Sequence, residues 1–230
     1  MPAYFNNLKT TYYKFDFQSY LESPPIKSNI GRLSFYKSWV KYWCDIFIER
    51  DKDIEDYAKQ KSNITPIFEM SQVRNKDVEF YSFDFKTSVG TYRYHYDVDI
   101  LNEIVKQKSL VPEDVDLKDV YVDSTTTLLF NKIKDNRPPI IVYNPGVPVP
   151  LLCVDGNKRI MAQKKLNNIK SIKAVYMPFE FSEYFFFNSL DNAFYYAHLE
   201  IEMLARLLEM GQDEKTIYMT TALSRNSHNG

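Results

Sequence analysis

Residues 151–159 read LLCVDGNKR, the most informative stretch of the chain. The apolar run Leu151–Val154 predicts a short buried strand, and Ile160–Leu166 has the pattern of a helix. The loop between them places Lys158 and Arg159 in the first turn of that helix, where the helix dipole already presents positive charge. Two cations are unfavourable there unless an anion binds, because unpaired backbone N–H groups and basic side chains then share one ligand. The stretch therefore predicts an anion site at a strand–loop–helix junction, with an ordinary solvated helix start as the alternative.

The bulk composition fits a globular protein without a strong electrostatic field. The chain has 230 residues, of which 44% are hydrophobic, so a sizeable core can form. Its net charge is −1, which argues against a nucleic-acid partner, although a local basic patch is compatible with it. The 2 cysteines, Cys44 and Cys153, are too few for a disulfide framework. The sequence shows no N-terminal apolar signal segment and no apolar run long enough to span a membrane. We therefore expect a cytoplasmic protein without a membrane partner.

The first third of the chain combines an arm with a long helix. Residues 1–30 are rich in Tyr and Asn and predict an extended arm with a turn. Residues 32–61 carry apolar side chains at spacings of three and four, including Trp39 and Trp43, and predict an amphipathic helix. We interpret the two tryptophans as the anchor of this helix on the core.

The middle of the chain predicts short strands that alternate with helices. Residues 78–85 and 91–96 indicate a hairpin, and Asp97 or Asp99 can cap the helix that follows. Asp123 precedes a predicted helix at residues 125–133, so it is either an N-cap or a carboxylate that faces the loop. Further strands are predicted at residues 116–122, 140–143, 149–154 and 172–177.

The C-terminal part of the chain predicts helices. Ser189 can cap a long amphipathic helix, a short helix is expected at residues 214–223, and the end from residue 225 is expected to fray. We divide the chain into an N-terminal arm and helical addition at 1–75, an α+β core at 76–178 and a C-terminal helical extension at 179–230.

The block from about residue 116 to residue 177 resembles the ParB/sulfiredoxin-like superfamily. Its predicted elements follow that family's order: short strand, helix, strand, hairpin, strand, an Asp-Gly-x-x-Arg loop that opens a helix, and another strand. Many members read Asp-Gly-Asn-His-Arg where this chain reads DGNKR at 155–159. The resemblance implies an α+β fold, with a ParB/sulfiredoxin-like mixed sheet core and helical N- and C-terminal additions.

The resemblance also implies a phosphate-binding loop, because the family includes CTP-hydrolysing partition proteins, nucleases, a free-serine kinase and sulfiredoxin. Carried over onto this sequence, the phosphate contacts would be made by Gly156, Asn157, Lys158 and Arg159. Asp155 would brace the turn or help to position a metal, and the implied cofactor is a nucleoside triphosphate with magnesium. Asp155 and Asp123 are the two candidate catalytic residues.

Two departures from the family pattern bear on the chemistry. Asn157 stands where sulfiredoxin has its nucleophilic Cys, which argues against sulfiredoxin chemistry. Lys158 replaces the motif His; it can bind phosphate as a point charge, but it is a poor general base near neutral pH. We therefore expect binding of a nucleotide or another phosphate-bearing ligand, with phosphoryl transfer or NTP hydrolysis as a further step.

Two other functions stay open. Because the motif His is lost and the chain has 18 Tyr and 16 Phe, it could be a catalytically inactive interaction or regulatory protein, for example in phage or inter-bacterial conflict. Such a protein would bind a protein partner through an aromatic-rich surface. A ParB-like nuclease or DNA-binding protein is the third interpretation, which the net charge disfavours. The 3 histidines lack ligand spacing, so we expect no dedicated metal site.

Overall fold

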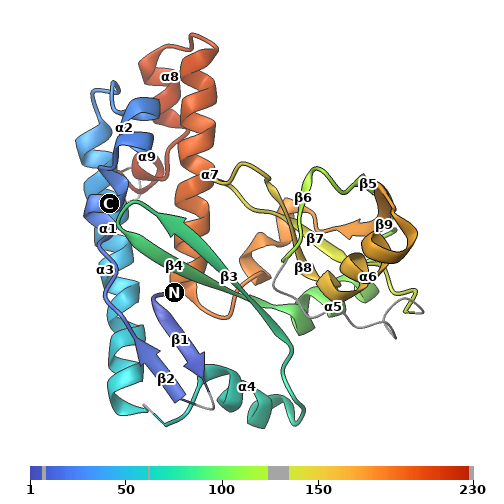
Figure 1. Ribbon diagram of the computed structural model, residues 1–230. Helices are drawn as coiled ribbons and strands as arrows, with labels where there is room; N and C mark the ends of the chain where they lie inside the picture. The colour runs from blue at the N-terminus through green and yellow to red at the C-terminus, as the bar shows by residue number, and fades with distance from the viewer. Residues whose placement is uncertain (7–8, 62, 124–134, 228–230) are drawn as a thin grey trace. The chain divides into compact units, whose positions relative to one another are not determined.

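The computed structural model describes residues 1–6, 9–61, 63–123 and 135–227, which Figure 1 traces by residue number. Two compact units can be distinguished, and each is described by itself. The terminal unit consists of Met1–Asn75, Phe83–Tyr94 and Asn188–Gly230, and the central unit of Lys76–Ser82 and His95–Phe187. The division into three domains at residues 75 and 178 stays a prediction.

The terminal unit is mainly helical. Its elements outside the hairpin described below are β1 (Ala3–Asn6), β2 (Lys9–Tyr12), α1 (Phe17–Leu21), α2 (Pro24–Ile30), α3 (Tyr36–Gln60), α4 (Pro66–Arg74), α7 (Ser189–Glu209), α8 (Glu214–Met219) and α9 (Ala222–Ser227). The extended backbone expected in residues 1–30 is found in β1 and β2, which pair antiparallel, but the expectation is wrong for the residues that form α1 and α2. Two of the short helices have local start signals. Asp16 accepts the Ser19 N–H at 2.9 Å, and Pro24 and Pro25 occupy the first turn of α2, where no N–H is needed.

The predicted long helices α3 and α7 carry an aromatic core. Phe194 of α7 stacks on Tyr92, with ring centroids 3.8 Å apart and 15° between the planes. Trp39 and Trp43 are buried, as expected of an anchor, and the Trp43 indole N–H donates to Glu200 at 2.9 Å. Further buried rings of this unit are Phe15, Phe17, Tyr20, Tyr36, Phe47, Phe85 and Tyr94. These aromatic side chains therefore form a core and not an exposed binding surface.

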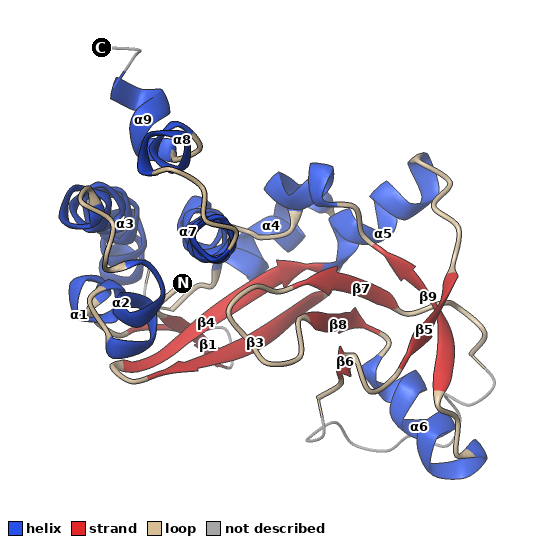
Figure 2. Ribbon diagram, turned by 90° about the horizontal axis from the view of Figure 1, so that it is seen from above, coloured by secondary structure: helices blue, strands red, loops and turns tan. Residues whose placement is uncertain are grey.

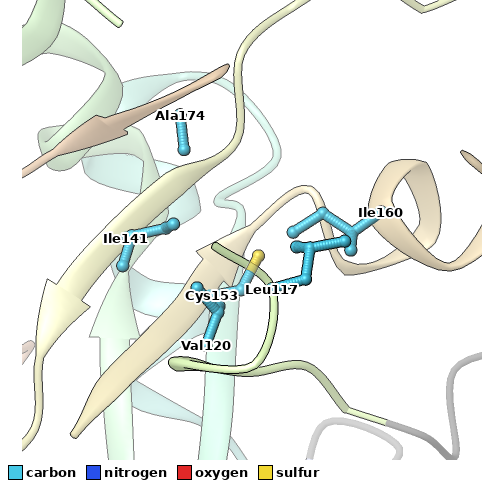
Figure 3. Packing of buried hydrophobic residues seen from close by; sticks show 6 residues of the cluster. All are labelled: Leu117, Val120, Ile141, Cys153, Ile160 and Ala174. Atoms are coloured by element: carbon cyan, nitrogen blue, oxygen red, sulfur yellow. The ribbon is translucent and has the colours of Figure 1, made fainter. Parts of the chain in front are cut away.

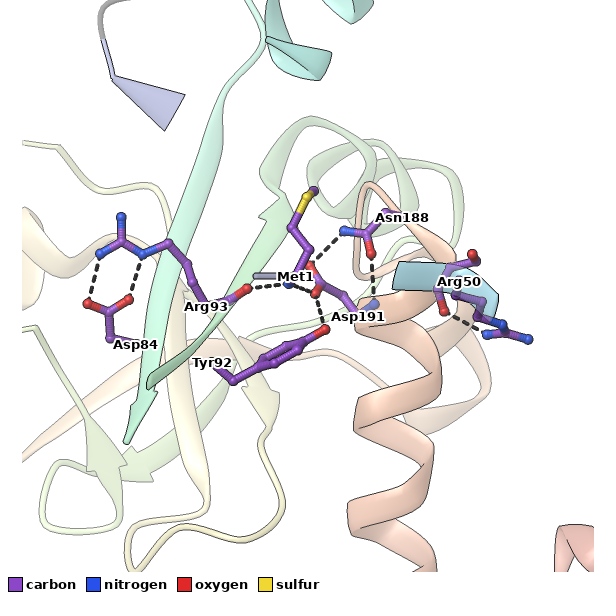
Figure 4. A network of polar contacts seen from close by, with 8 residues as sticks. Met1, Arg50, Asp84, Tyr92, Arg93, Asn188 and Asp191 are labelled. Atoms are coloured by element: carbon purple, nitrogen blue, oxygen red, sulfur yellow. Dashed lines mark hydrogen bonds and ion pairs between the residues drawn. The ribbon is translucent and has the colours of Figure 1, made fainter. Parts of the chain in front are cut away.

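A buried polar network holds the start of α7 (Figure 4). The Asp191 carboxylate accepts hydrogen bonds from the Tyr92 hydroxyl at 2.7 Å and from Asn188 Nδ2 at 2.8 Å, and it pairs with the amino group of Met1. Burial of a carboxylate is tolerated when donors of this kind surround it. Asn188 also accepts the Asp191 N–H at 2.8 Å, so Asn188 caps α7 and the predicted cap Ser189 is wrong.

The predicted hairpin is formed by β3 (Phe80–Thr87) and β4 (Gly90–Asp97), which pair in a two-stranded sheet. Gly90, at the turn, has a φ of 140°, which a side chain would disfavour. Asp97 then caps α5 (Val98–Gln107) by accepting the Ile100 N–H at 3.1 Å, one of the two caps predicted for that helix. Turn and capping residues close by in the sequence therefore determine where these strands and this helix begin and end.

The central unit contains a five-stranded sheet, drawn in red in Figure 2. Besides α5, its elements are β5 (Glu113–Asp116), β6 (Val120–Tyr121), β7 (Ile140–Tyr143), β8 (Leu151–Asp155), α6 (Asn157–Asn167), β9 (Ser171–Tyr176) and the 3₁₀ helix η2 (Phe179–Tyr184). The strand order is β5-β9-β7-β8-β6. β5 pairs antiparallel with β9, and β7 pairs antiparallel with β8. β6 pairs parallel with β8, and β7 pairs parallel with β9. The sheet is therefore mixed, which confirms the α+β class. The predicted helix at residues 125–133 lies outside the described residues.

A small apolar core fastens α6 to this sheet (Figure 3). Ile160, from the first turns of α6, is fully buried with Ile141 of β7, Cys153 of β8 and Ala174 of β9. Cys153 is a packing residue in the strand interior, as its apolar neighbours predicted. Because Ile160 is fixed by this core, the preceding loop and the start of α6 are held in one orientation.

At the C-terminal end, the structure has α8 and α9 where one short helix was predicted. α9 extends to Ser227, so the expectation of a frayed end from residue 225 is wrong for residues 225–227. Among the described residues, no helix combines the length and the apolar character that a bilayer crossing requires.

Candidate functional site

The loop at the end of β8 has a backbone that only glycine adopts easily. Gly156 is the N-cap of α6 and has a φ of 103°. A Cβ at this position would lie 2.8 Å from the Cβ of Pro139 and 2.8 Å from Nη2 of Arg159. Contacts this short require the neighbours to move. Gly156 is therefore needed by the packing of the loop itself, in addition to any close approach of a ligand.

The Asn157 side chain ties the loop to its surroundings. It is 8% exposed, its Oδ1 accepts the backbone N–H of Asp123 at 2.9 Å, and its Nδ2 donates to the carbonyl of Cys153 at 2.8 Å. This amide is occupied by the protein, so its side chain cannot serve as the expected phosphate contact without breaking those bonds. What Asn157 can offer a ligand is its backbone N–H.

The start of α6 presents backbone donors. The first helical hydrogen bond runs from the Ile160 N–H to the carbonyl of Gly156 at 3.0 Å. The amides of Asn157, Lys158 and Arg159 precede that bond and have no acceptor within the helix. Together with the helix dipole, they favour an anion at this end of α6.

Arg159 is buried, whereas its neighbour Lys158 is exposed. Only 4% of the Arg159 side chain is exposed, with Nη2 3.0 Å from Oδ2 of Asp155 and Nη1 3.7 Å from Oδ1 of Asp135. Its charge is thus paired, yet none of its three guanidinium nitrogens makes a hydrogen bond of good geometry to any described residue. A buried donor without an acceptor costs about 1–3 kcal/mol. A ligand that accepts from Arg159 would remove that cost.

These groups surround a cavity of about 290 Å³ in the central unit. It is lined by Glu79, Phe80, Tyr81, Val98, Asp123, Asp135, Arg137 and the segment Val154–Arg159. Among the described residues of this lining, four are carboxylates and three are cations. Lys158 and Arg159 both line the cavity, with Arg159 buried and Lys158 exposed. Because the carboxylates outnumber the cations, the lining is not electropositive.

Asp135 and Arg137 complete the charged wall. Arg137 Nε and Nη2 contact the two Asp135 carboxylate oxygens at 3.0 Å and 2.8 Å. This side-on pair, helped by the charge of Arg159, holds the pKa of Asp135 well below its usual range. The sequence reasoning missed both residues. The signal was available, because in the predicted β7–β8 hairpin Ile140 pairs with Asp155, so the residues before β7 must lie beside the loop after β8.

The two candidate catalytic carboxylates have different surroundings. Asp155 pairs with Arg159 across one turn, which fits the bracing role expected from the sequence. Asp123 lines the cavity, and its backbone is fixed by Asn157. Its predicted capping role concerns a helix outside the described residues.

A dedicated metal centre is not found in the part of the chain that the structure describes: no three His, Cys, Asp or Glu side chains there gather as metal ligands. A magnesium ion carried by a nucleotide needs only one or two protein carboxylates. The cavity carboxylate Asp123 is of the right type for such a ligand.

Comparison with known proteins yields no match among family models, curated proteins or solved structures.

Proposed function

We propose that the central unit binds a phosphate-bearing ligand, and within that class a nucleotide, at the loop 155–159 of a ParB/sulfiredoxin-like core. Arg159 carries this proposal. Its guanidinium group is buried at a helix N-terminus, lines a cavity, and has open N–H donors among the described residues. The loop motif and the order of β7, β8, α6 and β9 support the family assignment.

The chemistry assigned to each group follows from its position. The planar guanidinium of Arg159 offers parallel N–H donors that match two oxygens of a phosphate. The backbone amides at residues 157–159 add donors directed along the helix axis. Lys158, at the exposed rim, contributes a mobile cation that a bound phosphate can attract.

The excess of carboxylates over cations in the cavity lining indicates in which form a triphosphate binds. A free triphosphate is repelled by the cavity acids, whereas its magnesium complex carries less negative charge and offers the acids a ligand position. We therefore expect the magnesium complex to bind in preference to the free nucleotide. For turnover by phosphoryl transfer or hydrolysis, Asp123 is the carboxylate that we assign, because it lines the cavity and its backbone is fixed by Asn157.

Titration of the full chain with the magnesium complexes of ATP, CTP and GTP tests the proposal. We expect saturable binding that Lys158→Ala weakens by about tenfold, since a charge-assisted contact of this kind contributes roughly 1.5 kcal/mol. Lys165→Ala is the matched control, because it removes the same charge from an exposed position of the same helix, two turns away.

Arg159→Lys keeps a positive charge beside Asp155 but removes the planar fork, and we expect it to weaken binding more than Lys158→Ala does. The proposal fails if none of the three nucleotides binds. It also fails if Lys158→Ala and Lys165→Ala change the affinity equally, because the contact would then be a general effect of charge.

A further inference from the structure

The cavity has two chemically different walls. The segment Asp155–Arg159, with Arg137, supplies cations and backbone donors, the groups that bind phosphate. The segment Glu79–Tyr81, with Val98, supplies aromatic rings, an aliphatic side chain and one carboxylate. The second wall has the composition that binds a flat, partly polar ring system.

The position of Glu79 is fixed by its backbone. Its N–H donates to Oδ2 of Asp99 at 3.1 Å, and its carbonyl accepts the Val98 N–H at 3.1 Å. Asp99 also pairs with Lys76 at 3.1 Å, so the first turn of α5 holds the whole segment that precedes β3. Glu79 therefore lines the cavity from a backbone that two hydrogen bonds hold in place.

The two lining arginines have other carboxylates as ion-pair partners. Arg137, whose pKa Glu79 helps to raise, is held side-on by Asp135, and Arg159 is paired with Asp155. Glu79 is thus a carboxylate at the cavity that is not needed to neutralise either arginine.

Aromatic rings lie next to this carboxylate. Phe80 and Tyr81 follow Glu79 directly in the chain and line the same cavity. The Tyr81 ring is 6.4 Å from the Tyr96 ring, and the neighbouring Phe80 ring is 37% exposed. A base stacked on such rings gains roughly 1–3 kcal/mol whatever its identity. Because stacking does not distinguish the bases, discrimination between them must come from the Glu79 carboxylate.

We propose that the cavity selects guanine nucleotides, with the Glu79 carboxylate accepting two hydrogen bonds from the edge of the base. A carboxylate accepts and does not donate. Guanine alone among the common bases presents two adjacent donors there, N1–H and the 2-amino group. Adenine and cytosine each place an acceptor beside their amino group, which the carboxylate repels. A cavity of about 290 Å³ suits a single nucleotide better than an oligonucleotide. This inference rests on the proposed function and adds the identity of the base.

The test is a titration of the full chain with the magnesium complexes of GTP, ITP, ATP and CTP. We expect GTP to bind roughly ten- to a hundredfold more tightly than ATP or CTP, the range for a good bidentate pair. ITP, which lacks the 2-amino group, should fall between GTP and ATP. Glu79→Gln should lower the affinity for GTP to that for ATP, because it removes the pair of hydrogen bonds that guanine donates to the carboxylate. It should change the affinity for ATP by less than about twofold, because ATP does not form that pair. Glu113→Gln, an exposed position on β5, is the control and should leave the preference intact.

The outcomes separate the two proposals. Binding of all four nucleotides with equal affinity, or a preference for GTP that survives Glu79→Gln, overturns the guanine assignment and leaves nucleotide binding in place. Absence of binding by all four overturns the proposed function and the base assignment together.

Discussion

Arg159 and Lys158 are neighbours in sequence, but their environments differ. Successive residues of a helix point about 100° apart, so with Ile160 packed on the sheet Arg159 is buried and Lys158 is exposed, although both line the cavity. The sequence predicted the strand, the glycine and the helix start in this order, because together they are a local signal, and β8, Gly156 and α6 confirm that order. The sequence could not tell which cation is buried, since that depends on how α6 packs. Nor could it indicate that the Asn157 amide is used to hold Asp123 and Cys153 in place.

Gly156 gives a prediction at the level of a single residue. Gly156→Ala should lower the free energy of unfolding by about 3 kcal/mol, because backbone strain and a steric clash add. Gly211→Ala is the control: its φ of 69° is also positive, but a Cβ there meets nothing within 4 Å. We expect a loss of about 1 kcal/mol for the control. Denaturant unfolding measures both variants, and equal losses would contradict the packing role of Gly156.

The elements found from the sequence were those with strong local signals. Periodic apolar residues predicted α3 and α7, and strand and turn signals predicted the hairpin of β3 and β4. α6 ends at Asn168, which has the left-handed φ of 47°. The short helices α1, α2 and α4 were missed, because five to nine residues are too few to establish a helical period and their stability comes from packing.

The contact between α1 and α7 gives a prediction at the level of elements. His198 of α7 is buried, its Nδ1 donates to the carbonyl of Phe194 at 2.6 Å, and its Nε2 therefore accepts from the Tyr20 hydroxyl of α1. Burial lowers the pKa of His198 from 6.5 to about 4. Protonation would replace the acceptor with a donor and introduce a buried charge.

The sign of the pH effect follows from the lowered pKa. The unfolded chain binds the proton first, so the stabilisation is complete above pH 6.5 and is lost as the pH falls towards about 4. A shift of this size corresponds to about 3 kcal/mol. Denaturant unfolding at a series of pH values should show this loss in the parent and a flatter profile in His198→Gln. An identical pH profile in both proteins would exclude His198 as the source.

At the scale of the whole molecule, the chain is not assembled in sequence order. The two ends and the segment Phe83–Tyr94 form the terminal unit, while the flanks of that segment belong to the central unit. Patterns along the sequence do not reveal such an arrangement, because it depends on contacts between residues far apart in the chain. The candidate site is likewise non-local, since Glu79, Asp135 and Arg159 come from three separate segments of the central unit.

Hydrogen–deuterium exchange on the full chain, with and without saturating magnesium–GTP, tests the central claim that a phosphate docks at the start of α6. The amides of residues 157–159 lack helical acceptors, so they should exchange quickly without ligand and slow when phosphate oxygens accept from them. We predict protection in peptides that cover residues 155–160 and unchanged exchange in peptides from α3 and α7. Unchanged exchange at residues 155–160 under these conditions would contradict the account.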